Sequence, residues 1–263
     1  MINSIYLDNL IKTALLEDIN YLDAATDYLI DNNQVNTARF LAKDNGVLCG
    51  IDAALRVFEI LQPQGMEATV YKRDGDELQQ GDIIAEITGK TQILLKGERT
   101  ALNLLQHMSG VATATNKAVK IIKGTGASIA DTRKTLPGLR PLQKYAVTVG
   151  GGRNHRFNLS DAAMLKDNHI DAGGGIANAV AKLKAKLGHM TKVELEVRNL
   201  DNMSCEMMRD AVAITNGKAL LEASGNVTEE TLRAIAETGV DIISMGALTH
   251  SVKAFDISLK IVN

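Results

Sequence analysis

The chain has 263 residues, of which 45% are hydrophobic and 23% charged, and its formal net charge is −2. This composition is typical of a globular α/β protein and excludes a disordered chain. No apolar run reaches the roughly 18 residues of a membrane span, and the N-terminus has no signal-peptide pattern. The chain has few aromatic residues and no overall positive charge, whereas aromatic residues and positive charge are typical of proteins that bind nucleic acid. We therefore expect a cytoplasmic protein without membrane or nucleic-acid partners, in which Cys49 and Cys205 are ordinary thiols.

The first hundred residues predict an α+β domain with a small sheet. Leu7, Leu10, Ile11, Ala14 and Leu15 recur at helical spacing. TARFLAKDNGVLCG predicts two short strands around a DNG turn, and GIDAALRVFEIL predicts an amphipathic helix. Polar and apolar residues alternate in MEATVYKRDGDELQQGDIIAEITG around Asp-Gly and Gln-Gly turns, so this segment should be antiparallel β.

The rest of the chain predicts repeated strand–loop–helix units after a long helix in KGERTALNLLQHMSGVATATNKAVKII. The predicted strands lie in ASIADTRKT, AAMLKDNHI, KVELEV, KALLEASGN and VDIISMGAL. Repeated units of this kind imply a parallel sheet, and this many suggest a barrel. We expect an N-terminal α+β domain over 1–106 and an α/β-barrel catalytic domain over 107–249. A C-terminal helix over about 250–263 can pack back on the first domain.

Basic residues are concentrated in segment 130–170, and several of them follow predicted strands. In α/β barrels the site lies at the C-terminal ends of the strands. Guanidinium and ammonium groups that converge there suit a ligand with more than one carboxylate or phosphate. The residues assigned to such a ligand are Arg133, Lys134, His155, Arg156 and Lys166. The residues expected to pair only with surface acids are Arg140, Lys144 and Arg153.

Two late loops and one strand add candidates. EASGN and ISMGAL place small residues before helices, an arrangement that favours phosphate binding. The residues concerned are Ser224, Gly225, Asn226 and Gly246. Glu194 and Glu196 point the same way from VELEV, and Asp201 follows; such carboxylates can hold ribose hydroxyls or magnesium. For Glu194, neutralisation of a basic neighbour is an equally good interpretation.

Five segments together resemble the quinolinate phosphoribosyltransferase family, the decarboxylating nicotinate-nucleotide pyrophosphorylases, over nearly the whole chain. They are GERTALNLLQHMSGVAT, the segment 130–170, VELEV, LLEASGNV and ISMGALTH. DTRKT, GGGRNHR and LKDNHI occur in the family's order and spacing. The resemblance implies an N-terminal α/β, sandwich-like domain joined to an incomplete, open α/β barrel. It also implies a homodimer, or a dimer of dimers or hexamer, with each site completed by the neighbouring subunit.

The activity that the resemblance implies is that of a pentosyltransferase. It transfers the phosphoribosyl group of phosphoribosyl pyrophosphate, which arrives with Mg²⁺, to quinolinate. Decarboxylation then gives nicotinate mononucleotide, pyrophosphate and CO₂ in de novo NAD biosynthesis. By motif, the quinolinate residues are Arg133, Lys134, His155, Arg156 and Lys166, with Arg99 from the partner subunit. Glu196 and Asp201 match the ribose and metal acids and, with Lys134, form the implied catalytic set; Ser224, Gly225, Asn226 and Gly246 match the 5′-phosphate loop.

The chain departs from the family pattern after Glu196. In the family a helix and a strand precede the Asp-Asn-Met motif, whereas here VELEVRNL runs directly into DNMSCEMM. A crossover takes at least about 10–12 residues, so roughly one helix and one strand are absent, by true deletion or because the sequence omits a segment. We hypothesise an omitted segment. An unbroken peptide between Leu200 and Asp201 would refute this hypothesis and put Asp201 in doubt as a ligand.

Three alternatives stay open at the level of the sequence. A molybdenum-transport-associated paralogue would share the fold but act on a different acceptor. A catalytically dead homologue is conceivable because of the apparent deletion. KRDGDELQQGDIIAEITG resembles the hairpin of a lipoyl-type carrier domain, but it lacks a modifiable lysine at the hairpin tip, since Lys72 precedes the Asp-Gly turn.

Overall fold

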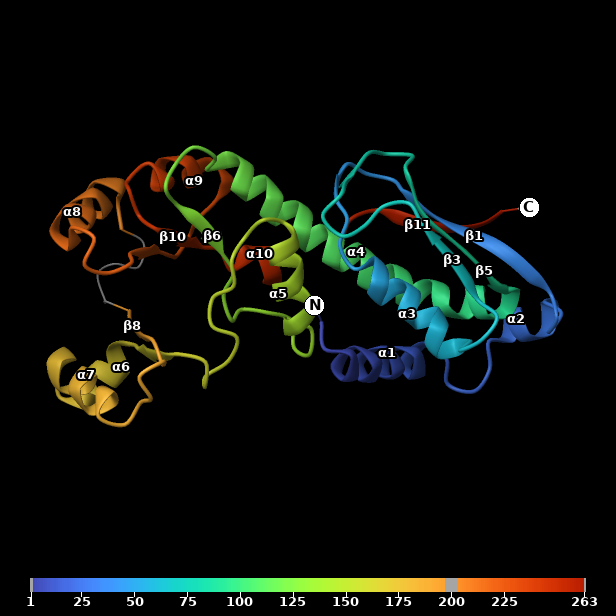
Figure 1. Ribbon diagram of the computed structural model, residues 1–263, viewed down its shortest axis with the longest axis horizontal. Helices are drawn as coiled ribbons and strands as arrows, with labels where there is room; N and C mark the ends of the chain where they lie inside the picture. The colour runs from blue at the N-terminus through green and yellow to red at the C-terminus, as the bar shows by residue number, and fades with distance from the viewer. Residues whose placement is uncertain (1, 197–202, 263) are drawn as a thin grey trace. The chain divides into compact units, whose positions relative to one another are not determined.

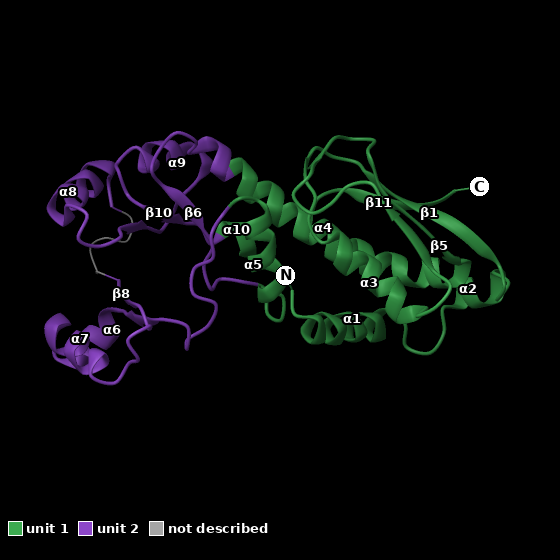
Figure 2. Cartoon of the chain, in the orientation of Figure 1, with its two compact units in different colours: residues 1–117, 136–151, 247–263 green, residues 118–135, 152–246 purple. Residues whose placement is uncertain are grey.

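A computed structural model describes residues 2–196 and 203–262 of the chain (Figure 1). The chain forms two compact units, each assembled from separate stretches of sequence (Figure 2). Unit 1 contains residues 1–117, 136–151 and 247–263, and unit 2 contains residues 118–135 and 152–246.

Unit 1 is built around a four-stranded antiparallel sheet with the order β11-β1-β5-β3. Its strands are β1 (Val35–Ala42), β3 (Glu67–Val70), β5 (Ile83–Lys90) and β11 (Ile257–Val262), and a separate pair is formed by β2 (Gly46–Val47) and β4 (Glu77–Leu78). Its helices are α1 (Ser4–Asp18), α2 (Ala24–Leu29), α3 (Ile51–Leu61), α5 (Arg140–Val149), α10 (Ala247–His250) and most of α4 (Thr91–Ile121).

The core of unit 1 follows from the two periodicities of its elements. Alternate residues of β1 are buried, and α3 buries one apolar face, as expected for a half-buried strand and an amphipathic helix. Phe40 of β1 meets Phe58 of α3 edge to face, with ring centroids 6.2 Å apart. Gly50 begins α3 with a φ of 99°, and the Asp74 carboxylate accepts hydrogen bonds from the Gly50 and Ile51 N–H groups.

One expectation for this unit was wrong. The segment 250–263 does not form a helix, because α10 ends at His250 and β11 follows. Ile257 and Leu259 are buried in β11, two residues apart, and the strand pairs with β1 along its whole length. The segment instead joins the N-terminal sheet as a strand. The two strands predicted around the DNG turn are present as β1 and β2. They belong to different sheets, because β1 pairs with β5 and β11, whereas β2 pairs with β4.

Unit 2 contains the predicted parallel strand–loop–helix units. Its strands are β6 (Ser128–Ala130), β7 (Ala163–Leu165), β8 (Val193–Leu195), β9 (Glu222–Ala223) and β10 (Ile242–Ser244). Its helices are α6 (Asp167–Gly173), α7 (Ile176–Lys184), α8 (Cys205–Thr215) and α9 (Glu229–Ala236). The strands form two parallel sheets, β6-β10-β9 and β7-β8. The sheet is therefore not closed among the described residues, consistent with the open α/β barrel.

The predicted gap lies between β8 and β9 in chain order. Asp201 and the peptide between Leu200 and Asp201 lie outside the described residues. Within the described part of the chain, β8 pairs with β7 alone and β9 pairs with β10 alone. Each of the two sheets therefore has an unpaired edge among the described strands, at β8 and at β9.

Two expectations about chemistry and membranes concern the whole described chain. Cys49 and Cys205 are free thiols, as predicted, and Cys49 is buried. Residues 2–196 and 203–262 include no helix with both the length and the apolar character required to cross a bilayer.

Candidate active site

A cavity of about 540 Å³ lies within unit 2. The predicted site residues that line it are Arg133, Lys134, His155, Arg156, Lys166, Glu196, Ser224, Gly225 and Asn226. Thr132, Met164, Glu194 and Ser244 complete its wall. The cavity therefore brings together residues from segments that are far apart in the sequence.

The parallel strands explain why these residues meet. Arg133 follows β6, Lys166 follows β7, and Glu196 follows β8. The turn at 224–226 follows β9, and Ser244 ends β10. Because parallel strands present their carboxyl ends at one edge of a sheet, the polar residues after each strand converge there, as the sequence predicted.

Several predicted residues are not in the cavity wall. Arg99 is an exposed residue of α4 in unit 1, and Gly246 does not line the cavity although Ser244 does. Asp201 lies outside the described residues. Lys144, expected to pair with a surface acid, is fully buried in α5.

Ion pairs connect acids and bases inside the cavity. Lys166 Nζ lies 2.7 Å from Glu196 Oε2, and His155 Nε2 lies 3.1 Å from Glu194 Oε2. Glu194 thus lies beside a basic side chain, as one of the two interpretations considered from the sequence requires. Four cationic side chains still face two carboxylates in the wall, so the cavity carries an excess of positive charge and favours an anionic ligand.

Arg156 adds a more specific indication of an anion. One terminal nitrogen, Nη1, donates a hydrogen bond to the Ala162 carbonyl at 3.0 Å, which fixes the guanidinium. The Nε atom of Arg156 is buried and has no hydrogen-bond partner among the described residues. A buried donor without an acceptor is unfavourable, and an oxygen of a bound carboxylate or phosphate would satisfy it.

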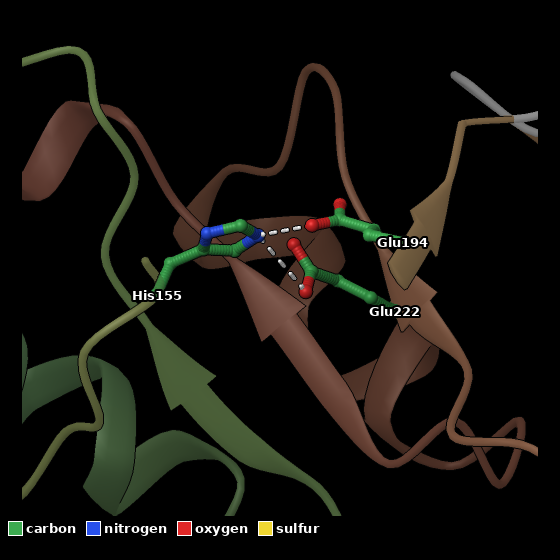
Figure 3. A group of neighbouring side chains, drawn as sticks. All are labelled: His155, Glu194 and Glu222. Carbon is green, nitrogen blue, oxygen red and sulfur yellow. Dashed lines mark ion pairs between the residues drawn. The ribbon is translucent and has the colours of Figure 1, made fainter. Parts of the chain in front are cut away.

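The hydrogen bonds of His155 define its tautomer. The backbone N–H of His155 donates to the fully buried Asp131 carboxylate at 2.9 Å. Its ring Nδ1 accepts a hydrogen bond from the Arg156 backbone N–H at 2.7 Å. A neutral imidazole with an accepting Nδ1 carries its proton on Nε2. The Nε2–H group therefore faces Glu194 and, at 3.7 Å, Glu222 (Figure 3).

This tautomer argues against a metal centre at the same place. The donor atoms of His155, Glu194 and Glu222 lie within 4.8 Å of one another, a spacing that could suit a metal ion. Binding a metal through Nε2 would require a lone pair there and a proton on Nδ1. Because Nδ1 accepts the Arg156 N–H bond, the arrangement fits a proton on Nε2 and does not fit a metal.

Glu222 was missed by the sequence analysis. Its carboxylate is 24% exposed and accepts a hydrogen bond from the Ser244 hydroxyl. Burial is the main cause that raises the pKa of the Glu222 carboxyl, and the charges of Glu194 and Asp131 raise it further. Strand alternation could have identified it, because Glu222 precedes Ser224 by two positions and lies on the same face of the chain.

The turn at 224–226 shows why its residues suit a phosphate loop. Gly225 and Asn226 have φ angles of 81° and 45°, so the chain turns sharply directly after β9. Thr228 then caps α9, forming a capping box with Thr231. A tight turn before a helix N-terminus is a frequent arrangement for anion binding.

Comparisons with known proteins cover nearly the entire chain. Residues 23–109 match the family model for the quinolinate phosphoribosyl transferase N-terminal domain, and residues 111–260 match that for its C-terminal domain. The chain is 40% identical over 275 positions to the probable nicotinate-nucleotide pyrophosphorylase (carboxylating) of Bacillus subtilis, covering 98% of this chain and 94% of the relative. Identity to the Mycobacterium leprae nicotinate-nucleotide pyrophosphorylase (carboxylating) is 41%, over 95% of each chain.

A solved structure supports the same relationship. The nicotinate-nucleotide pyrophosphorylase from Francisella tularensis superimposes with a TM-score of 0.95 at 39% identity, covering 100% of this chain and 98% of that one. The Bacillus subtilis alignment spans 275 positions, more than the 263 residues present here. The relative therefore has residues at positions where this chain has none.

Proposed function

This chain belongs to the quinolinate phosphoribosyl transferase family and is a phosphoribosyltransferase, and from this premise we propose that the cavity of unit 2 holds both of its substrates. The reaction transfers a phosphoribosyl group to quinolinate and releases pyrophosphate and CO₂, giving nicotinate mononucleotide for de novo NAD biosynthesis. The observation that carries the placement is the excess of cations in the cavity wall. None of the relatives described above supports the alternative acceptor of a molybdenum-transport paralogue.

Quinolinate is a pyridine with two carboxylates, and the cationic part of the cavity suits it. Arg133 and Arg156 offer planar forks that bind carboxylates with paired hydrogen bonds. Lys134 and Lys166 add compact charges, and the Nε2–H of His155 is a further donor. The partnerless Nε of Arg156 is the strongest single indication of where a carboxylate oxygen belongs.

Phosphoribosyl pyrophosphate suits other residues of the cavity wall, the turn at 224–226 and Glu196. The turn at 224–226, with Gly246 by resemblance, would hold the 5′-phosphate. The Glu196 side chain is 40% exposed in the cavity wall. Its carboxylate could accept hydrogen bonds from ribose hydroxyls and would help to hold Mg²⁺. Bound Mg²⁺ would neutralise charge on the leaving pyrophosphate. Asp201 is proposed as the second acid from the resemblance alone.

The mechanism follows from charge and position. The bond from ribose C1 to pyrophosphate breaks as positive charge grows on the sugar, and a nearby Glu196 carboxylate stabilises that charge. The quinolinate nitrogen forms the new bond to C1. The adjacent carboxylate then leaves as CO₂, its electron pair stays on the ring carbon beside the quaternary nitrogen, and that carbon takes a proton. Positioning by the cationic wall, including Lys134, accounts for much of the rate.

The test is release of CO₂ and pyrophosphate from quinolinate, phosphoribosyl pyrophosphate and Mg²⁺. The wild type should release the two products in equal amounts. Arg133→Ala should lower kcat/KM at least about tenfold, since a charge-assisted pair is lost. Arg153→Ala is the matched control, because Arg153 is an exposed arginine of the same segment outside the cavity wall. No release by the folded wild type, or equal losses in both variants, would overturn the proposal.

We also propose that the protein works as a homodimer in which Arg99 enters the partner's site. Large apolar side chains of unit 1 are exposed, among them Leu16, Tyr21, Tyr28 and Leu29 at 71–88%. Exposed apolar surface of this kind often marks an interface, and Arg99 itself is exposed. Mixing inactive Arg99→Ala and Arg133→Ala subunits should restore about a quarter of the activity, because mixed dimers contain one intact site. No recovery after subunit exchange would contradict the shared site.

A further inference from the structure

Glu222 approaches the cavity without being part of its wall. Its carboxylate lies 3.7 Å from His155 Nε2, and it comes from β9, whereas Glu194 reaches the same nitrogen from β8 in the other sheet (Figure 3). The imidazole edge is therefore flanked by two carboxylates from separate sheets. Glu222 is itself held by the hydroxyl of Ser244, the residue that ends β10.

His155 is restrained on its other side by the backbone. Its N–H donates to Asp131, and its Nδ1 accepts from the Arg156 N–H. The bond to Nδ1 holds one edge of the ring, and the two carboxylates lie near the opposite edge, at Nε2. Glu194 Oε2 lies 3.1 Å from His155 Nε2, within hydrogen-bonding distance, whereas Glu222 Oε2 at 3.7 Å lies beyond it. The effect of Glu222 is therefore electrostatic attraction of the Nε2–H group.

We propose that Glu222 is a positioning residue that orients the His155 imidazole and so sets the affinity for quinolinate, an inference that rests on the proposed function of the cavity. With Glu222 present, the Nε2–H lies between two acceptors and stays at the cavity wall. Without Glu222, only one of the two carboxylates, that of Glu194, attracts the Nε2–H group, and the ring is held less firmly at the cavity wall. Glu222 therefore acts through His155 and does not touch the substrate.

A double-mutant cycle tests this coupling. The dissociation constant for quinolinate is measured by calorimetry for the wild type, Glu222→Gln, His155→Ala and the double variant. Glu222→Gln keeps the shape of the side chain and should weaken quinolinate binding about threefold to tenfold, the range for losing one partly buried polar partner. The KM for phosphoribosyl pyrophosphate should change less than about twofold. In the His155→Ala background the substitution should have no further effect.

Glu237→Gln is the matched control, because Glu237 also belongs to unit 2 and pairs with Arg233 on the surface. It should leave quinolinate binding unchanged. Equal weakening by Glu222→Gln in the presence and absence of the His155 ring would overturn the proposal. Tighter quinolinate binding by Glu222→Gln would overturn it as well, since the carboxylate would then act by repelling the substrate.

A second measurement does not depend on the variants folding. The ¹⁵N resonances of the His155 ring, assigned by comparison with His155→Ala or by sequential assignment in the wild type, report which nitrogen carries the proton. A protonated Nε2 and an unprotonated Nδ1 are expected, and a proton on Nδ1 would overturn the proposal. Absence of quinolinate turnover by the wild type would instead contradict the proposed function, so the two failures are distinguishable.

Discussion

The carboxylate of Glu196 pairs with Lys166 and is also proposed to stabilise charge on the ribose, and the sizes of the two effects allow these roles to be separated. Lys166 Nζ and Glu196 Oε2 are 2.7 Å apart, but the side chains are 53% and 40% exposed. Pairs this exposed contribute about 0.2–1 kcal/mol, so Glu196→Gln should lower the free energy of unfolding by less than about 1 kcal/mol. If the carboxylate stabilises charge on the ribose, kcat/KM for phosphoribosyl pyrophosphate should fall about 10²–10³-fold.

The matched control is Glu237→Gln. Arg233 Nε and Glu237 Oε1 are also 2.7 Å apart, with side chains 47% and 54% exposed, so the two pairs have similar geometry and exposure. Urea unfolding should show similar small losses of stability for both variants, whereas product release should fall for Glu196→Gln alone. A decrease of less than about threefold in kcat/KM for Glu196→Gln would show that the carboxylate only neutralises Lys166 and would refute the catalytic role.

Two further predictions concern stability. An alanine Cβ at Gly150 would lie 2.4 Å from the Ala112 carbonyl oxygen, so Gly150→Ala should lower the free energy of unfolding by about 1–3 kcal/mol. The control Gly126→Ala, with no atom within 4 Å of its Cβ, should change it by less than about 0.5 kcal/mol. Equal urea midpoints for the two variants would contradict the steric argument. Burial lowers the pKa of His107 in the folded protein. As the pH falls, His107 is therefore protonated in the unfolded chain before it is protonated in the folded one. The free energy of unfolding should decrease as the pH drops below about 6.5 and towards the lower pKa of the folded state. In urea unfolding between about pH 7.5 and 5.5, His107→Gln should make this decrease in stability smaller. The control His189→Gln changes an exposed histidine and should leave the decrease as it is. The same pH dependence of stability in both variants would exclude His107 as its cause.

The elements of this protein and much of its site could be predicted from the sequence because both depend on local patterns. Apolar periodicity indicated the helices and the parallel strands of unit 2, and the polar residues after those strands indicated the cavity wall. Arg133, Lys166 and Glu196 are far apart in the chain, yet each follows a strand, and that position alone places them at one edge. The identity of the substrates came from the family resemblance.

The tertiary structure decided what depends on partners distant in the sequence. The alternation of Ile257 and Leu259 is compatible with a strand, but pairing with β1 is what makes that segment part of the N-terminal sheet. Nothing in the sequence around Glu222 separates it from the other acidic residues, and only its distance of 3.7 Å from His155 Nε2 in the structure distinguishes it. Local periodicity determines the type of an element, whereas strand pairing and the environment of a charge depend on long-range contacts that the order of residues does not display.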